Sequence, residues 1–355
     1  MVPSDEPAPD PTLTLLETYS ALNSATITTL NSLPSALEFL RFVAQNRPFV
    51  VRGGAADWKA VREWNVETLK KVLEGVNVNV AVTPKGNADS PVPSPTDPST
   101  LLFVKPHEEQ QPFASFLDFV IAQEKHHYSS SNSRSRPLGG EVRYAQTQND
   151  NLPQEYSLLC HHVPPSIPFA RIALGSCPDA TNLWIGNSLS TTALHKDNYE
   201  NIYVQIVGRK RFLLLPPVAW AAVAEKVLRP ASYVRMQGLE LGDASGWGIE
   251  EEEGEGVPFA TWDPDSQGDG DGDGNEKTYQ KAVQPMRVEL GEGDLLYLPA
   301  LWYHKVSQSC SEEGICVAVN YWHDMEFAGG FWPLCGFVRD VGLAATKNAT
   351  RNAGN

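Results

Sequence analysis

The sequence predicts a mainly β protein, a barrel or jelly roll with helices at its edges. Between residues 183 and 322, short apolar segments rich in β-branched and aromatic residues alternate with turns of Gly, Pro and Asp. These candidate strands are 183–187, 190–196, 201–207, 210–215, 286–290, 294–298, 302–307 and 315–322. Hydrophobic residues make up 41% of the chain and aromatic residues 9%, so a sizeable core can form and global disorder is excluded.

The first part of the chain mixes helices and strands that we expect to extend the barrel. An acidic, proline-rich segment at residues 1–12 predicts a flexible tail, and the mixed region follows at 13–140. Apolar residues fall at helical spacing from 14 to 46, interrupted by Pro34, which suits the first turn of a helix. Further predicted elements are strands at 48–53, 76–82 and 143–148, helices at 66–73 and 113–125, a loop at 84–98 and a mobile linker at 129–136.

The second part contains the predicted barrel core at 141–324 and a helical segment with a tail at 325–355. An insertion at 236–281 interrupts the core, and its acidic and Gly/Asp-rich stretch spans 245–277. The repeat GDGDGDGN has the aspartate spacing of a calcium loop, but Gln280 stands where such a loop needs its closing glutamate, and no flanking helices are evident. A solvated, disordered loop is the preferred interpretation.

Charge and cysteine usage restrict the class of partner and the compartment. The net charge of −15 argues against a nucleic-acid-binding surface and suits a basic protein or peptide partner, although solubility alone would explain it too. No apolar run is long enough for a transmembrane helix, and the N-terminus lacks the pattern of a signal peptide. The five cysteines are scattered without a Cys-x-x-Cys pair, which indicates free thiols and argues against zinc. We predict a cytoplasmic protein, with nuclear entry left open.

Three residues have the pattern of a metal site. His195 and Asp197 are two residues apart, so on a strand their side chains would point to the same face and could bind one ion. His304, in LPALWYH, supplies a second imidazole. Together they form the ligand set of a 2-His-1-carboxylate iron(II) site, in which they are both metal ligands and catalytic residues. The alternative is that they are surface residues or hydrogen-bonded core residues.

Lys210 suggests what else this site binds. A 2-oxo acid that chelates iron through its keto end leaves a distant carboxylate, which needs a cation and a hydroxyl group where water is excluded. Lys210 follows the Gly208 turn and can supply the charge, while Thr192 and Tyr144 can each supply a hydroxyl. A lysine in GRKRF is more often a solvated hairpin residue, an interpretation that suits Arg209 and Arg211 well.

Long segments of the chain carry a family resemblance. The segments NRPFVVRG, VNVNVAVTP, RYAQTQNDNL, NLWIGNSLSTTALHKDNYENIYVQIVGRKRFLLLPP, GDLLYLPALWYHKV and VAVNYWHDME stand in this order within residues 34–325. Together they resemble the Jumonji C (JmjC) oxygenases. The resemblance implies a double-stranded β-helix of the cupin-like type, with His195, Asp197 and His304 binding iron(II). It also implies that Lys210, Thr192 and Tyr144 bind 2-oxoglutarate, and that Asn201, Asn320 and Trp322 lie beside this co-substrate.

The resemblance further implies a dioxygenase that uses iron(II), 2-oxoglutarate and O2. The most similar subfamily implies C-3 hydroxylation of a lysyl residue in a translation-associated GTP-binding protein. Three alternatives stay open: a metal-dependent peptidase acting on histone tails, a JmjC histone lysine demethylase, and a non-catalytic cupin-like binding module. The insertion at 245–277 is longer than this subfamily leads us to expect, so substrate contacts cannot be inferred there.

Further predictions concern the C-terminal segment and the remaining histidines and cysteines. The aromatic residues Phe327, Phe331, Trp332 and Phe337 either pack on the barrel or form a dimer contact, and the resemblance to homodimeric JmjC hydroxylases favours the dimer. The pairs at 126–127 and 161–162 are expected to be surface histidines. A disulfide between Cys310 and Cys316 would be geometrically feasible, but the predicted compartment argues against it.

Overall fold

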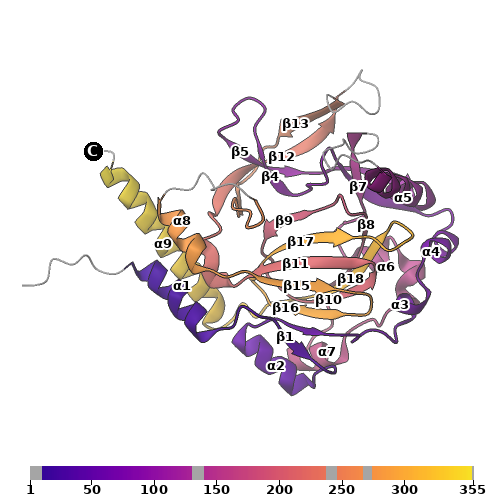
Figure 1. The fold of residues 1–355 in the computed structure, drawn as a ribbon, viewed down its shortest axis with the longest axis horizontal. Helices are drawn as coiled ribbons and strands as arrows, with labels where there is room; N and C mark the ends of the chain where they lie inside the picture. Colours follow the sequence, from indigo (N-terminus) through magenta and orange to yellow (C-terminus); the bar gives the residue numbers. More distant parts are fainter. Residues whose placement is uncertain (1–9, 130–139, 237–245, 267–273, 354–355) are drawn as a thin grey trace, which may run out of the picture.

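Two facing β-sheets form the centre of the protein in a computed structural model, which describes residues 10–129, 140–236, 246–266 and 274–353 (Figure 1). The larger sheet has the strand order β1-β2-β16-β10-β18-β8, and the smaller sheet has the order β15-β11-β17-β9. The bounds in the larger sheet are β1 Thr28–Leu30, β2 Phe49–Val51, β8 Ala180–Gly186, β10 Tyr199–Val207, β16 Leu295–Leu298 and β18 Cys316–Asp324. The bounds in the smaller sheet are β9 Thr192–His195, β11 Arg209–Leu215, β15 Met286–Leu290 and β17 Tyr303–Ser309.

These sheets confirm the predicted jelly roll. Each of the eight predicted segments between residues 183 and 322 forms a strand, with ends shifted by a few residues. β10 lies antiparallel between β16 and β18, and β11 lies antiparallel between β15 and β17. The antiparallel pairing of sequentially distant strands is typical of a Greek-key jelly roll.

Alternation along the strands divides the apolar residues into layers. On β10, Tyr203 faces the space between the two sheets, whereas Ile202 and Val204 face outward. On β11, Phe212 and Leu214 face inward and Leu213 faces outward. β10 is therefore buried on both faces and β11 on both faces in its second half, so polar residues that point into the inner layer can be shielded from water.

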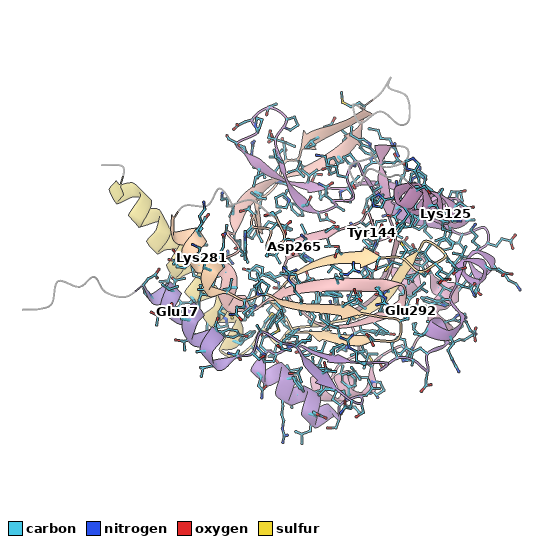
Figure 2. The ribbon with its side chains drawn as sticks, in the orientation of Figure 1. Glu17, Lys125, Tyr144, Asp265, Lys281 and Glu292 are labelled. Carbon is cyan, nitrogen blue, oxygen red and sulfur yellow. The ribbon has the colours of Figure 1, made fainter. Side chains whose placement is uncertain are left out.

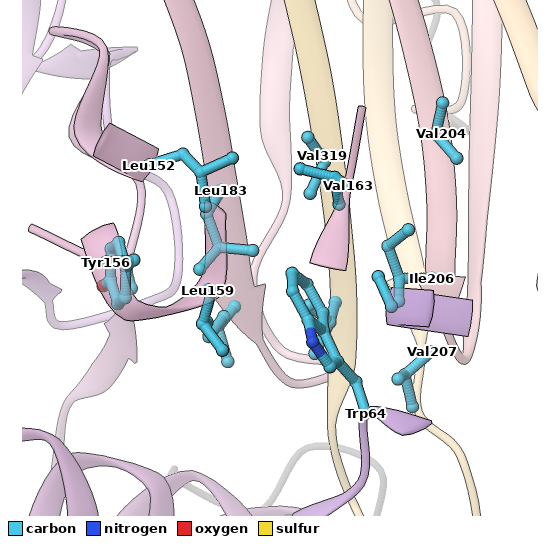
Figure 3. Packing of buried hydrophobic residues seen from close by; sticks show 14 of the residues in the cluster. Trp64, Leu152, Tyr156, Leu159, Val163, Leu183, Val204, Ile206, Val207 and Val319 are labelled. Atoms are coloured by element: carbon cyan, nitrogen blue, oxygen red, sulfur yellow. The ribbon is translucent and has the colours of Figure 1, made fainter. Parts of the chain in front are cut away.

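Helices cover the outer face of the larger sheet. They are α2 Ala36–Gln45, α3 Lys59–Glu63, α4 Val66–Val72, α5 Phe113–Ser129, α6 Asn151–Gln154, the 3-10 helix η2 Ser157–His162 and α7 Pro168–Leu174. Figure 3 shows part of the resulting cluster, in which Trp64, Leu159 and Val163 lie near Ile206 and Val319 of the sheet. This apolar layer holds β10 and β18 in place.

A second helical group covers the outer face of the smaller sheet. It contains α1 Pro11–Leu22, the 3-10 helix η3 Pro217–Ala221, α8 Gly274–Ala282 and α9 Phe331–Ala353, which gather at one side of the barrel (Figure 1). Leu16 of α1, Trp220 of η3 and Tyr303 of β17 belong to one buried cluster. An added Cβ at Gly342 would lie 1.9 Å from Trp220 Cη2, so glycine allows α9 to approach η3 this closely.

Two further sheets lie beside the barrel. One has the order β6-β3-β7, and the bridge between Ala145 and Ile185 connects it to β8. The other, which we name the outer sheet, has the order β13-β12-β5-β4, with β14 paired to β12. The bounds are β3 Asn77–Thr83, β4 Ser90–Pro93, β5 Leu101–Lys105, β6 His107–Pro112, β7 Val142–Tyr144, β12 Lys226–Arg235, β13 Trp247–Glu251 and β14 Val257–Phe259.

Several sequence-based predictions need correction. The predicted tail at 1–12 ends earlier, because α1 begins at Pro11 and the Asp10 side chain accepts a hydrogen bond of 2.8 Å from Thr12 N. Pro34 lies outside α2, whose N-cap is Ser35. The predicted loop at 84–98 contains β4, and β5, β6 and β12 were not anticipated. Prolines and polar side chains in these segments interrupt the alternating apolar pattern that predicts a strand.

The insertion at 236–281 is also more ordered than predicted. Glu250 and Glu251 lie on β13, paired with Ser232 and Ala231 of β12, and α8 begins at Gly274. Residues 267–273, which contain most of the Gly/Asp repeat, and residues 130–139, which contain most of the predicted linker, lie outside the described residues, as does the segment 1–9. No helix within the described ranges combines the length and apolarity that crossing a membrane requires. The predicted C-terminal helix is confirmed as α9.

Candidate metal and co-substrate site

Two paired strands bring the three predicted metal ligands together. His195 ends β9 and lies opposite His304 of the antiparallel strand β17. Asp197 lies just beyond β9 rather than on it, and its carbonyl accepts a hydrogen bond of 2.8 Å from Leu301 N. Leu194 and Lys196 point to the opposite face, as the strand period requires: Leu194 joins the outer cluster and Lys196 pairs with Glu225.

The donor atoms of these residues converge on one point. One ligand atom from each of His195, Asp197 and His304 lies within 4.8 Å of the others. Asp197 Oδ2 is 3.7 Å from His195 Nε2 and 3.6 Å from His304 Nε2. Within the described ranges, this is the single group of at least three His, Cys, Asp or Glu residues with such spacing. Two imidazoles and one carboxylate with free positions around the metal suit non-haem iron(II).

Backbone carbonyls fix the tautomer of both histidines. His195 Nδ1 is 2.8 Å from the Ala193 carbonyl, and His304 Nδ1 is 3.0 Å from the Trp302 carbonyl. Because a carbonyl only accepts, each Nδ1 carries the proton and each Nε2 presents its lone pair toward Asp197. Burial lowers the pKa of His304 to about 4, His195 adds to this effect, and Asp197 opposes it. The neutral imidazole that a metal requires is therefore in place at His304, and the three residues fit iron(II).

Lys210 lies at the closed end of the same cavity. Its side chain is 2% exposed, whereas its neighbours Arg209 and Arg211 are exposed and pair with Glu289. Lys210 Nζ donates a hydrogen bond of 2.8 Å to Tyr144 Oη. The alternative of a solvated hairpin lysine is thus wrong for Lys210 and right for the two arginines, because alternate residues of β11 face opposite sides.

The charge of Lys210 has no counter-ion in the described part of the chain. Burial opposes the charged form of its ammonium group, and the charges that would raise its pKa are those of ionised Tyr144 and Tyr203. Burial also raises the pKa of both tyrosines, so their hydroxyls stay neutral. None of the ion pairs among the described residues includes Lys210. A buried, uncompensated cation is costly, and an anionic ligand would remove that cost.

Tyr144 reaches Lys210 across the strand β8, at a position where a glycine leaves room for its ring. Tyr144 ends β7 and lies among the strands, away from the helical side marked by Glu17 and Lys281 (Figure 2). Its ring passes Gly186 of β8, where an added Cβ would lie 2.4 Å from Tyr144 Cδ2. Glycine at this position therefore allows the tyrosine hydroxyl to enter the cavity.

The remaining predicted residues line the cavity between the metal ligands and Lys210. Thr192, Asn201, Asn320 and Trp322 all contribute to it, and it encloses about 420 Å³ including its mouth. Asn320 Nδ2 donates to Asn201 Oδ1 at 3.1 Å, and Trp184 Nε1 donates to Asn320 Oδ1 at 2.9 Å. Trp322 stacks on Tyr199, with ring centroids 4.7 Å apart. The structure thus brings every predicted site residue into or against one cavity.

Several residues that line this cavity were not predicted from the sequence. The additional lining residues are Gln148, Trp184, Tyr203, Phe212 and Val306. The strand period could have identified Tyr203, because it lies two residues after Asn201 on β10 and shares its face. By contrast, His162 lies apart from the site, and its Nδ1 accepts a hydrogen bond of 2.9 Å from Trp64 Nε1. All five cysteines are free.

An open groove continues from the cavity along its rim. Gln148 lines both spaces, and the groove is also lined by Asp89, Glu108 and Tyr233. Asp89 accepts a hydrogen bond of 2.9 Å from Gln146 Nε2 and has a positive φ of 49°. Desolvation raises the pKa of Asp89, while Gln146 and the nearby His195 lower it. A partly buried carboxylate therefore lies near the candidate metal site.

Comparison with known proteins agrees with this geometry. Residues 34–329 match the family described as "Cupin-like domain". The chain is 34% identical, over 84% of each chain, to "Bifunctional peptidase and (3S)-lysyl hydroxylase JMJD7" of Homo sapiens. It is 33% identical, over 83% of each chain, to "JmjC domain-containing protein E" of Dictyostelium discoideum. It is also 33% identical to "Lysine-specific demethylase JMJ32" of Arabidopsis thaliana, over 84% of this chain and 81% of that protein.

Proposed function

Since the chain belongs to the JmjC group of the cupin-like family, we propose that it is an iron(II)- and 2-oxoglutarate-dependent protein hydroxylase that modifies a lysyl residue. The observation that carries the proposal is the pairing of a 2-His-1-carboxylate group with the buried cation of Lys210 in one cavity. Members of this group are typically 2-oxoglutarate oxygenases. When bound, iron(II), 2-oxoglutarate and O2 would together supply the oxidising chemistry that hydroxylates an unactivated C–H bond.

The residues of the chain have separate tasks in this mechanism. His195, Asp197 and His304 hold the metal, and their Nδ1–H bonds to backbone carbonyls keep both rings oriented. Lys210 and Tyr144, which are hydrogen-bonded to each other, would hold the distant carboxylate of the co-substrate by charge-assisted hydrogen bonds. Asn201, Asn320 and Trp322 shape the wall between these two ends and exclude water. The protein thereby orients the reactants and restricts access to them.

The groove beside the cavity supports a lysyl substrate. Asp89 and Glu108 line an open groove of about 950 Å³, solvent included. Lys105 also lines it, but its ammonium group pairs with Glu252. A lysine entering the cavity would bring its ammonium group near the Asp89 carboxylate and offset the cost of burying that charge. The proposed reaction is C-3 hydroxylation, and the proposed partner is a translation-associated GTP-binding protein.

The relatives' names support two alternative reactions. One relative is named as a peptidase as well as a hydroxylase, and another is named as a lysine-specific demethylase. Metal-dependent hydrolysis has no use for a 2-oxo acid, so the buried Lys210 favours the oxygenase over the peptidase. Demethylation would use the same co-substrate and differs only in the C–H bond that is oxidised. A non-catalytic binding module would not require the three ligand atoms to converge.

Mass spectrometry of lysine-containing peptides separates these reactions. Peptides from a candidate GTP-binding protein, unmodified or methylated on lysine, would be incubated with the enzyme, iron(II), ascorbate and O2, with and without 2-oxoglutarate. We expect a mass gain of one oxygen atom on lysine that requires 2-oxoglutarate. Loss of a methyl group from the methylated peptide would instead establish demethylation. Backbone cleavage that is indifferent to 2-oxoglutarate would establish the peptidase and contradict the proposal.

A second proposal concerns assembly. The side chains of Phe331, Trp332, Leu334 and Phe337 on α9 are exposed, and an apolar helical face of this kind suits a homodimer contact. Light scattering should give twice the chain mass for the protein and a lower mass for Phe337→Glu. A protein that is monomeric at all accessible concentrations would contradict the dimer. Cytoplasmic and nuclear localisation stay predictions that imaging of the tagged chain would test.

A further inference from the structure

A buried carboxylate joins the strands that carry the metal ligands to the C-terminal helix. The Glu225 side chain is 4% exposed, and it lies in the turn between η3 and β12. Lys196 Nζ donates a hydrogen bond of 2.8 Å to Glu225 Oε2, and Tyr303 Oη donates one of 3.2 Å to the same oxygen. The other oxygen, Oε1, is 2.9 Å from Arg339 Nε of α9.

The partners of Glu225 are immediate neighbours of all three candidate ligands. Lys196 stands between His195 and Asp197, and Tyr303 directly precedes His304. Lys196 Nζ also donates to Tyr303 Oη at 3.1 Å, so Glu225, Lys196 and Tyr303 form a closed triangle of hydrogen bonds. Because neighbouring strand residues face opposite sides, this triangle lies behind the metal site and cannot reach the metal itself. Its effect on the metal must act through the backbone of β9 and β17.

The C-terminal helix has a second contact with the same region. Cys335 of α9 packs on the cluster of Ala300, Leu301 and Met325. Leu301 N donates a hydrogen bond to the Asp197 carbonyl at 2.8 Å, and Leu301 has a positive φ of 66°. Packing from α9 thus supports a turn with a strained backbone at Leu301. The hydrogen bond from this turn holds the backbone of Asp197 in place. Both contacts place α9 directly behind the candidate metal ligands.

We propose that Glu225 is a positioning residue that, together with Arg339 of α9, fixes the spacing of His195, Asp197 and His304. The inference rests on the proposed metal centre but is independent of which substrate is modified. Without the Glu225 carboxylate, the ammonium of Lys196 and the guanidinium of Arg339 would lose their shared counter-charge and separate. The β9 segment could then move relative to β17, and the three ligand atoms would no longer converge.

Cobalt(II) binding to the full chain tests this role without any turnover. Its visible absorption reports both the affinity and the ligand geometry, and it would be measured for the unmodified chain, Glu225→Gln and Arg339→Met. We expect Glu225→Gln to weaken binding by about tenfold, as is usual for groups that support metal ligands, and to change the band shape. Arg339→Met should cause a smaller weakening in the same direction, and Glu225→Asp should restore part of the affinity.

A matched variant separates positioning from general stability. Asp294 is another carboxylate with little exposure, and it forms an ion pair with Arg52. It lies in the turn between β15 and β16, which carry none of the candidate ligands. Asp294→Asn should lower the melting temperature but bind cobalt(II) like the unmodified chain. Unchanged affinity and absorption in Glu225→Gln would overturn the inference. If Glu225→Gln does not fold, unchanged binding in Arg339→Met overturns it instead. An unmodified chain that binds no cobalt(II) would overturn the metal centre and this inference together.

Discussion

The two ends of the central cavity differ in charge and in exposure. At the mouth, the side chains of His195 and Asp197 are 22% and 23% exposed, and two imidazoles face a carboxylate. At the closed end, Lys210 is 2% exposed and carries a cation without a counter-ion in the described ranges. One end therefore lacks a cation and the other lacks an anion. A metal ion and a dicarboxylate co-substrate would satisfy both ends at once.

The difference also determines how each end responds to mutation. The mouth is open to water, so loss of a ligand there removes binding without leaving an unsatisfied group in the core. The closed end is dry, so the charge of Lys210 is a cost to the fold that only a bound anion offsets. A mutation at either end should therefore change ligand binding and protein stability to different extents or in opposite directions. Four variants test this contrast, in order of decreasing expected effect.

Asp197→Ala should have the largest effect. It removes the single carboxylate of the candidate ligand group, and we expect metal affinity to fall by more than about 100-fold and iron-dependent turnover to be lost. Stability should change little, because the side chain is partly exposed. Titration with cobalt(II) and thermal melting measure the two quantities. Retained full activity would remove Asp197 from the ligand set.

Lys210→Met should have the next largest effect, in opposite directions on function and stability. The 2-oxoglutarate affinity should fall by about 100-fold, because the co-substrate carboxylate would be buried without a cation. The unliganded protein should become more stable by about 1–2 kcal/mol, since an unpaired buried charge is replaced by an apolar chain of similar length. Calorimetry with the co-substrate and denaturant unfolding test both parts. Reduced stability with unchanged affinity would show that Lys210 is merely structural.

Tyr144→Phe should have a smaller effect at the same end. It removes a hydroxyl that accepts a hydrogen bond of 2.8 Å from Lys210, but keeps the ring that passes Gly186. We expect the KM for 2-oxoglutarate to rise by about tenfold, the value of one hydrogen bond to a charged group. The metal affinity should not change, and a change in it would contradict the separation of the two ends.

Asp89→Asn should have the smallest effect, confined to the protein substrate. We expect the KM for a lysine peptide to rise by about fivefold, with the KM for 2-oxoglutarate unchanged. Desolvation raises the pKa of Asp89, so its carboxylate is protonated at a higher pH than an exposed aspartate. Peptide KM should therefore rise as pH falls through the acidic range in the unmodified enzyme and stay flat in the variant. A parallel pH profile in both proteins would exclude Asp89 from substrate binding.

The barrel and the centre of its site could be predicted from local sequence patterns. Period two along β10 and β11 determines which side chains face inward, so the strands and Lys210 were within reach of the sequence. Thr192 and Tyr144 were predicted as hydroxyl groups for the same ligand, and resemblance to the JmjC family then identified Asn201, Asn320 and Trp322. The His-x-Asp spacing together with His304 indicated the metal ligands, although Asp197 lies beyond the end of its strand.

Long-range packing explains what could not be predicted. Pro91 and Pro93 lie on β4 at the edge of the outer sheet, where a missing N–H does no harm, and they made the strand resemble a loop. Asp89 reaches the site because its loop packs on the segment before β9, through the hydrogen bond from Thr191 N to the Gly86 carbonyl. Glu225 meets Tyr303 across a separation of 78 residues. No local pattern encodes such contacts.

The most direct test of the two-ended cavity compares two ligands that differ at one end. 2-Oxoglutarate and 2-oxopentanoate share the keto acid that binds the metal, but 2-oxopentanoate has a methyl group in place of the distant carboxylate. Their affinities would be measured by calorimetry with cobalt(II) in the site, for the unmodified protein and for Lys210→Met. We predict that the unmodified protein prefers 2-oxoglutarate by at least about 100-fold and that Lys210→Met loses this preference. Equal affinities in the unmodified protein would contradict the account.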